Sequence, residues 1–290
     1  MSTTIRSLQA LKAEGRRFAM LTAYDFPTAQ VVDEAGVPVI LVGDSVANNV
    51  LGYPDTVGVT MDEMLHHCRA VRRGVTNALL VGDMPFMSYQ VSVEEGMRNA
   101  ARFLKEAGAN AVKLEGPEID LTHRLTAAGI PVMAHVGLTP QSVNQMGGYR
   151  VQGKTDDAAD RIEREALDLQ AAGAFAIVLE GIPSDLGRHL TAMLRIPTIG
   201  IGAGPHTDGQ VLVFHDMIGL NARVPKFVKQ YAQLRTEIAR AVSEFVSEVE
   251  AGTFPDGAHS YSGGRIYGGG EGTPADAAPE AHPTASGVKA

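Results

Sequence analysis

Val39-Ile40-Leu41-Val42-Gly43-Asp44-Ser45 is the stretch of sequence from which the fold class follows. Its apolar residues run without alternation, which is typical of a parallel strand that is buried on both faces. Gly43 lets the backbone turn where the strand leaves the core, and Asp44 stands at that point. We therefore expect this strand to deliver a carboxylate to one end of a parallel sheet.

Three further apolar runs have the same form and also lead to a carboxylate. They are Leu79–Asp83, Val112–Gly116 and Ile177–Gly181, which carry Asp83, Glu115 and Glu180. Because the carboxyl ends of the strands of a parallel barrel lie on one face, these acids and Asp44 are predicted to line one site.

Helical segments alternate with these strands and set the fold class. Four helices are expected to end in a glycine that an apolar strand follows, and these glycines are Gly36, Gly108, Gly129 and Gly173. Capping-box patterns at Thr60 and Ser92 mark two helix starts. The predicted strands cover residues 18–25, 39–44, 79–83, 112–115, 130–135, 176–180, 196–201 and 210–214. This alternation predicts an α/β fold, the (β/α)8 TIM barrel, with an open doubly wound sheet as the alternative.

The C-terminal part of the chain has a different composition. Residues 225–250 carry apolar side chains at helical spacing and predict one long helix. From Asp256 on, Gly, Pro, Ala, Ser and His dominate, and such a segment cannot bury enough apolar surface to order itself. We therefore expect a barrel domain over residues 1–255 and a disordered tail over 256–290.

The overall composition excludes several classes of protein. A net charge of −8 without a basic cluster argues against nucleic-acid binding. No apolar stretch approaches 18 residues and the start of the chain lacks a secretory pattern, so no membrane association is expected. The single cysteine, Cys68, excludes an internal disulfide, and a cytoplasmic protein is expected.

The predicted site has the chemistry of a hard metal ion. Converging carboxylates repel one another, and a divalent cation removes that conflict; oxygen ligands favour Mg²⁺ over Zn²⁺. Lys113 and Glu115 are two residues apart on a strand and therefore face the same side, either to hold an anionic substrate or as an ion pair that fills the barrel. His135, which is expected to end the fifth strand, is assigned as a neutral hydrogen-bonding partner rather than a metal ligand.

A glycine-rich segment, Gly200-Ile201-Gly202-Ala203-Gly204, needs a separate interpretation. Its spacing is not that of a dinucleotide-binding loop, and no helix is predicted directly after it. Glycines at the mouth of a barrel more simply let a loop approach a ligand.

Seven segments, in order along the chain, resemble the motifs of the ketopantoate hydroxymethyltransferase family. They are Thr22–Asp25, Gly43–Ser45, Gly82–Phe86, Lys113–Gly116, Ala134–Gln141, Leu179–Pro183 and Ile199–Gly204. The resemblance runs from about Thr4 to Pro255 and implies a barrel enzyme of pantothenate biosynthesis that forms a homodecamer. Such an enzyme transfers a hydroxymethyl group from 5,10-methylenetetrahydrofolate to 3-methyl-2-oxobutanoate and gives 2-dehydropantoate through a Mg²⁺-stabilised enolate.

The resemblance also assigns roles to residues of this chain. The metal ligands that match are Asp44, Asp83 and Glu115, and Glu180 matches the general base. The residues expected to contact the oxoacid are Asp44, Ser45, Asp83, Lys113 and His135.

Two other functions remain as alternatives. One is a Mg²⁺-dependent barrel lyase that acts on oxoacids; such lyases carry a catalytic cysteine on a loop, whereas Cys68 falls in a helical pattern. The other is a non-catalytic protein that binds an oxoacid or a metal, against which the complete set of acids with Glu180 argues.

Overall fold

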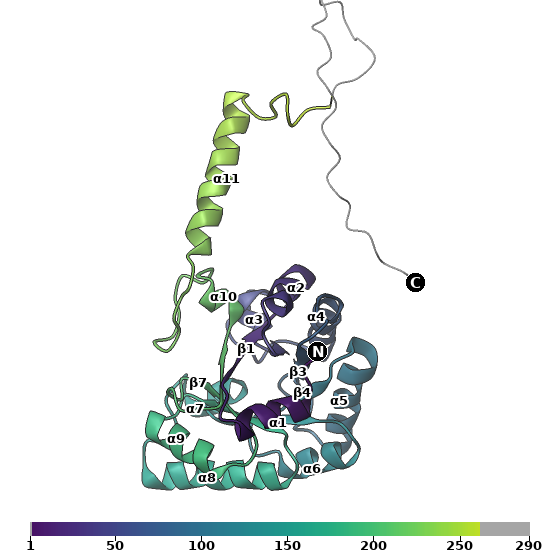
Figure 1. The fold of residues 1–290 in the computed structure, drawn as a ribbon, viewed down its shortest axis with the longest axis vertical. Helices are drawn as coiled ribbons and strands as arrows, with labels where there is room; N and C mark the ends of the chain where they lie inside the picture. Colours follow the sequence, from purple (N-terminus) through teal and green to yellow (C-terminus); the bar gives the residue numbers. More distant parts are fainter. Residues whose placement is uncertain (1, 262–290) are drawn as a thin grey trace, which may run out of the picture. The chain divides into compact units, whose positions relative to one another are not determined.

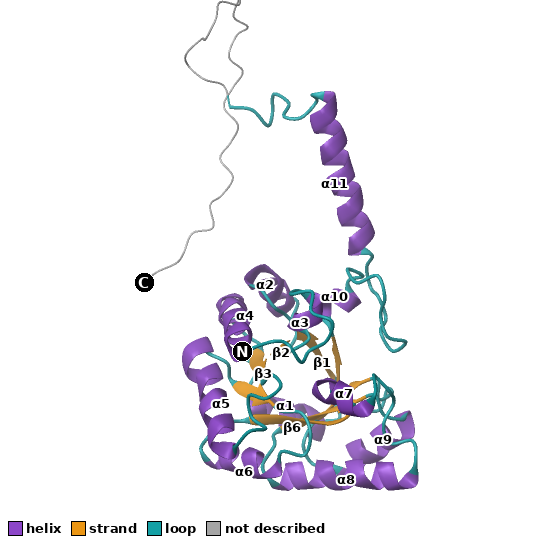
Figure 2. Ribbon diagram, turned by 180° about the vertical axis from the view of Figure 1, so that it is seen from behind, coloured by secondary structure: helices purple, strands orange, loops and turns teal. Residues whose placement is uncertain are grey.

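The computed structural model describes residues 2–261 of the chain. Within them, eight parallel strands close into a barrel in the order β1 to β8, with helices on the outside (Figure 1). The strands, seen in orange in Figure 2, are β1 (Phe18–Thr22), β2 (Val39–Val42), β3 (Leu79–Asp83), β4 (Ala111–Lys113), β5 (Val132–Gly137), β6 (Ala176–Glu180), β7 (Thr198–Ile201) and β8 (Gly209–Leu212). The predicted TIM barrel is confirmed, and the open sheet is excluded because β8 pairs with β1.

Most of the long helices lie between consecutive strands, as a barrel requires. The helices are α1 (Ile5–Ala13), α2 (Phe26–Glu34), α3 (Val46–Asn49), α4 (Met61–Gly74), α5 (Val93–Ala107), α6 (Ile119–Ala127), η1 (Pro140–Ser142), α7 (Val143–Met146), α8 (Asp156–Ala171), α9 (Ser184–Met193), α10 (Phe214–Met217) and α11 (Leu234–Ala251). The four glycines predicted to end helices all have a positive φ, between 69° and 102°, which residues other than glycine rarely adopt. They let the chain reverse toward the next strand.

Apolar side chains form layers on both sides of the strands. Inward-facing residues such as Met20, Val81 and Val178 fill the barrel together with Leu8 of α1, which packs against them. Outward-facing residues such as Ile40 and Ile177 pack against the surrounding helices. The barrel interior is therefore a packed core, and the space for a ligand lies at the strand ends.

The ends of several elements differ from the prediction. β1 stops at Thr22 because Asp25 accepts a hydrogen bond from the backbone N–H of Thr28 and caps α2. β5 continues to Gly137, which pairs with Glu180, so His135 is not the last residue of its strand. At Ser92 the side chain accepts a hydrogen bond from the Glu95 N–H, which is half of the predicted capping box.

The long C-terminal helix was predicted to begin too early, since α11 begins at Leu234. Residues 231–235 instead donate backbone hydrogen bonds to the end of α10 and the residues after it, for example from Tyr231 N to Met217 O over 2.7 Å. Phe227 packs over Gly202. These tertiary contacts override the helical spacing of the apolar residues.

The structure divides into two units, Met1–Glu237 and the part from Ile238 on. The first unit contains the whole barrel, and the second contains most of α11, whose apolar side chains Ile238, Val242 and Phe245 are exposed. Of the predicted tail, residues 256–261 are exposed, and residues 262–290 lie outside the described part of the chain. No helix within residues 2–261 is long and apolar enough to cross a membrane.

Candidate active site

A cavity of about 110 Å³ lies at the carboxyl ends of the strands. Its apolar side is formed by Leu41, Val178, Ile201, Val211 and Val213. Its polar side contains the residues singled out from the sequence, namely Asp44, Ser45, Asp83, Lys113, Glu115 and Glu180. The structure thus brings together six predicted site residues that come from four different strands or the residues that follow them.

Lys113 is the central cation of this cluster. Its Nζ donates hydrogen bonds to Oδ1 and Oδ2 of Asp83 over 2.7 and 2.9 Å, and to Oε1 of Glu115 over 3.4 Å. All three side chains are almost fully buried. Burial disfavours the lysine charge, but Asp83, Glu115 and Asp44 outweigh it and raise the pKa of Lys113. The ammonium group is therefore a fixed positive charge at the strand ends.

The acids exceed this one cation in number. Burial, followed by repulsion from Asp83 and Glu115, raises the pKa of Asp44 well above its usual range. Burial also raises the pKa of Asp83, although Lys113 opposes the shift. Burial also favours a higher pKa for Glu115, but Lys113 and His135 together outweigh burial and lower the pKa of this carboxyl. The cluster therefore contains more acids than one lysine keeps ionised, and a further cation would favour their ionised forms.

Gln141 connects two of these acids and had no role in the sequence interpretation. Its backbone N–H donates to Oε2 of Glu115 over 3.0 Å, and its Nε2 donates to Oδ2 of Asp44 over 3.0 Å. The hydroxyl of Tyr89 donates to its Oε1 over 2.7 Å, which fixes the orientation of the amide. Gln141 lies in the quoted segment Ala134–Gln141, but hydrogen bonds to residues 97 positions away leave no local pattern in a sequence.

His135 lies between two acids inside the barrel. Its Nδ1 is 3.4 Å from Oε1 of Glu115, and its Nε2 is 3.5 Å from Oε2 of Glu180. Neither ring nitrogen has a hydrogen-bond partner among residues 2–261, although both are buried. Buried polar groups are normally satisfied. Here the two nitrogens face the carboxylates of Glu115 and Glu180, and the ring does not line the cavity.

Glu180 is the least buried acid of the cavity, with a side chain that is 16% exposed. Burial raises its pKa to about 7, while His135 and Lys113 partly oppose the shift. A carboxylate with a pKa near neutrality can take up a proton and return it. Glu180 therefore has the properties of a general base at the mouth of the barrel.

The carboxylates of the site fit a Mg²⁺ ion that takes only some of its ligands from the protein. Among residues 2–261 no three side chains of His, Cys, Asp or Glu form a ready cage for a metal ion. Mg²⁺ commonly binds one or two protein carboxylates and completes its shell with water and substrate oxygens. Asp83 ends β3, and Asp44 lies two residues beyond the end of the neighbouring strand β2; the N–H of Asp44 donates to Oδ2 of Asp83 over 3.2 Å. These adjacent carboxylates fit a hard divalent cation.

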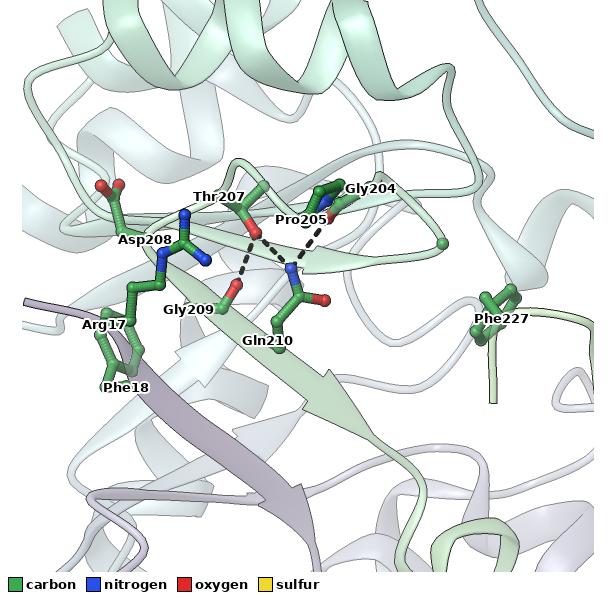
Figure 3. Close-up of a pocket in the computed structure, with 10 residues that line it drawn as sticks. Arg17, Phe18, Gly204, Pro205, Thr207, Asp208, Gly209, Gln210 and Phe227 are labelled. Carbon is green, nitrogen blue, oxygen red and sulfur yellow. Dashed lines mark hydrogen bonds between the residues drawn. The ribbon is translucent and has the colours of Figure 1, made fainter. Parts of the chain in front are cut away.

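A larger cavity of about 370 Å³ lies beside β8 (Figure 3). It is lined by Arg17, Gly202, Gly204, Gln210 and Phe227, among others, and by none of the predicted site residues. Residues 202–208, which connect β7 to β8, form no helix, and Nε2 of Gln210 donates to the carbonyl oxygen of Gly204 and to Thr207. No helix N-terminus follows the glycines within residues 202–208, so this segment lacks the helix-end phosphate site of a dinucleotide-binding loop.

The closed barrel with acids and a lysine at its strand ends defines an α/β-barrel enzyme that acts at that face. The family model of ketopantoate hydroxymethyltransferase matches residues 2–257, and the chain belongs to this family. A 3-methyl-2-oxobutanoate hydroxymethyltransferase of Acidothermus cellulolyticus is 57% identical over 89% of this chain and 96% of its own length. One of Syntrophus aciditrophicus is 55% identical with the same coverage.

More distant solved structures share the fold. Phosphonopyruvate hydrolase in complex with oxalate and Mg²⁺ has a TM-score of 0.59 at 15% identity, covering 89% of this chain and 93% of its own. 2,3-Dimethylmalate lyase has a TM-score of 0.58 at 17% identity, covering 88% and 90%. At this sequence identity the likeness to the lyase shows the fold alone. The lyase alternative also calls for a catalytic cysteine on a loop, whereas Cys68 is buried within α4.

Proposed function

We propose that this protein transfers a hydroxymethyl group from 5,10-methylenetetrahydrofolate to 3-methyl-2-oxobutanoate and so makes 2-dehydropantoate for pantothenate and coenzyme A biosynthesis. Membership of the family and the names of relatives that are more than half identical support this reaction. The structural observation that carries it is Glu180, a carboxylate with a pKa of about 7 that shares one small cavity with Lys113 and the paired acids. Such an arrangement suits the removal of a proton next to a ketone.

The oxoacid is held by the polar side of the cavity. Its carboxylate is an anion that the Ser45 hydroxyl and the Lys113 ammonium can bind by charge-assisted hydrogen bonds. His135 does not line the cavity but lies behind it, with Nε2 3.5 Å from Oε2 of Glu180. The branched alkyl group lies against the apolar side, where Val178 and Val211 are buried. The cavity, with its apolar and polar sides, suits a small branched oxoacid.

We assign Asp44, Asp83 and Glu115 to the binding of Mg²⁺. When bound, Mg²⁺ supplies a Lewis acid that polarises the ketone of the oxoacid. Gln141 keeps Asp44 and Glu115 in place through its side-chain and backbone N–H groups. The three acids remain ionised more easily with a cation beside them, because the cation removes the repulsion that raises the pKa of Asp44.

The chemical step begins at Glu180. Its carboxylate removes the proton from C3 of the oxoacid, and Lys113 stabilises the negative charge that develops on the oxygen. C3 then forms its bond to the one-carbon unit, and both C–N bonds of the folate methylene bridge break. Water provides the hydroxyl oxygen of the product and a proton for one of the two folate nitrogens. Protonated Glu180 lies at the mouth of the barrel, where it can return its proton to the departing folate nitrogen.

The test separates proton removal from binding. In Glu180→Gln the side chain keeps its shape and loses the base, so exchange of the C3 hydrogen with solvent should fall by about 10²–10⁴-fold. Exchange is followed by NMR without folate, and the affinity for the oxoacid is measured by calorimetry in saturating Mg²⁺. Glu163→Gln, whose carboxylate pairs with His189 on the surface, is the matched control. Rapid exchange in Glu180→Gln removes Glu180 from the role of base and makes His135 the next candidate.

We also propose that the protein works as a cytoplasmic homo-oligomer, a decamer by the family resemblance. The exposed apolar side chains of α11 support self-association, because an apolar helix face of this kind is normally covered. Sedimentation velocity of the full chain tests the assembly. The boundary at residue 255 between the catalytic domain and the tail is part of the same proposal.

A further inference from the structure

Tyr24 lies directly behind the candidate site and has no part in the chemistry described above. It follows β1, is 1% exposed, and its hydroxyl is 2.8 Å from Oγ of Ser45. Ser45 lines the cavity, and its hydroxyl has no other hydrogen-bond partner among residues 2–261. Tyr24 itself does not line the cavity. Its hydroxyl reaches a bound molecule through Ser45, the cavity residue to which it is hydrogen-bonded.

The Tyr24 ring is held rigidly in this position. Nδ1 of His67 lies 2.7 Å from the backbone oxygen of Tyr24, and the ring packs against His215 with a centroid distance of 5.4 Å. On the other side of Ser45, residue 43 is a glycine. A Cβ atom at that position would lie 2.9 Å from Oγ of Ser45 and would push the hydroxyl away. Gly43 thus leaves room for the Ser45 hydroxyl, and the contact with Tyr24 fixes its orientation.

The Tyr24 hydroxyl is the donor in this pair. Burial and the nearby charges of Asp44 and Asp216 raise its pKa, so the phenol stays protonated at every working pH. A phenol is a more acidic group than an aliphatic alcohol and hence the better donor. When Tyr24 donates, the oxygen of Ser45 is used as an acceptor. The hydrogen of Ser45 then remains for a partner in the cavity.

We propose that Tyr24 is a positioning residue that directs the hydroxyl hydrogen of Ser45 toward the carboxylate of the oxoacid. This inference rests on the proposed function, in which Ser45 contacts that carboxylate. It predicts that Tyr24 affects the binding of the oxoacid while the proton removal by Glu180 is preserved. Tyr24 and Ser45 should also act as one unit, because the first has no contact with the substrate.

A double-mutant cycle tests the inference on the full chain in saturating Mg²⁺. Tyr24→Phe removes one neutral hydrogen bond and keeps the buried ring, so Kd for 3-methyl-2-oxobutanoate should rise about two- to twelve-fold. In the Ser45→Ala background the same change should alter Kd by less than about two-fold, because the residue through which Tyr24 acts is absent. The turnover at saturating oxoacid should change little in Tyr24→Phe. A purely structural role of Tyr24 would not produce this dependence on Ser45.

The outcomes separate this inference from the proposed function. An equal loss of affinity in both backgrounds, or no loss in either, overturns the role of Tyr24 and leaves the proposed reaction intact. If Ser45→Ala alone leaves Kd unchanged, the contact between Ser45 and the oxoacid is wrong, and the inference falls with it. Should Tyr24→Phe fail to fold, Gly43→Ala takes its place, since its Cβ displaces the same hydroxyl. Gly43→Ala must then raise Kd for 3-methyl-2-oxobutanoate when Ser45 is present, and must leave Kd unchanged in the Ser45→Ala background.

Discussion

The pH dependence of proton removal gives a direct measure of the environment of Glu180. Burial raises the pKa of this carboxyl to about 7, and a protonated carboxyl cannot act as a base. The ionised fraction is about one-eleventh at pH 6 and about ten-elevenths at pH 8. The rate should therefore rise about tenfold between these values. A glutamate with an ordinary pKa of about 4.3 would be ionised at both and would give a flat profile.

The assay follows loss of deuterium from C3 of labelled 3-methyl-2-oxobutanoate in ordinary water, in saturating Mg²⁺ and without folate. Lys113 does not titrate in this range because its pKa is raised, so the plateau above pH 8 should persist. His135→Asn provides the second test. His135 lowers the pKa of Glu180, and without it the midpoint should move above 7. Equal rates at pH 6 and pH 8 in the unaltered protein refute the reasoning.

Three other predictions concern the metal, the fold and the tail. Asp83→Asn should weaken Mg²⁺ binding at least about tenfold in calorimetry, because it replaces a ligand; unchanged affinity removes Asp83 from the metal site. Asp33→Asn should destabilise the protein by about 2–4 kcal/mol in urea at pH 7, since the buried carboxylate accepts hydrogen bonds from the N–H groups of residues 76–78. These bonds lower the pKa of Asp33, so its contribution to the free energy of unfolding is lost as pH falls below about 4. The free energies of unfolding of the variant and the unaltered protein should therefore converge there, and a difference that stays constant with pH contradicts this. Truncation before Asp256 should leave melting temperature and turnover unchanged, and a loss of several degrees shows that the tail packs on the body.

The barrel could be predicted because its signals are local. Each strand is a short apolar run such as Val39–Val42, and each of four helices ends at a glycine that needs a positive φ. The same order of strand, helix and glycine recurs along the chain, so a few residues in each strand–helix unit are enough to predict the topology. The prediction failed for residues 225–233, where backbone hydrogen bonds to the residues around α10 replace those of a helix. Such pairing depends on a distant segment, and helical spacing of side chains cannot reveal it.

The acids of the site could be predicted for the same reason, because each one ends a strand or lies two residues beyond its end. The residues that hold them could not. Gln141 bonds to Asp44, and Tyr24 bonds to Ser45, across separations of 97 and 21 residues. Asp33 holds the start of β3 from within α2. Each of these side chains acts through long-range hydrogen bonds whose geometry only the folded chain defines.

Lys113 shows why the structural and functional interpretations of the buried cluster are not exclusive. The ion pair that the sequence left as an alternative exists, since Nζ of Lys113 contacts both oxygens of Asp83. A buried ion pair loses the hydration of both charges, and apolar residues of similar volume often stabilise a core as well or better. Stability alone therefore does not explain a lysine among Asp44, Asp83 and Glu115, where burial and repulsion raise the pKa of two of the acids. On the proposed function, the acids would serve to bind a cation and Lys113 to bind the anionic oxoacid, so each ligand would meet a fixed partner of opposite sign.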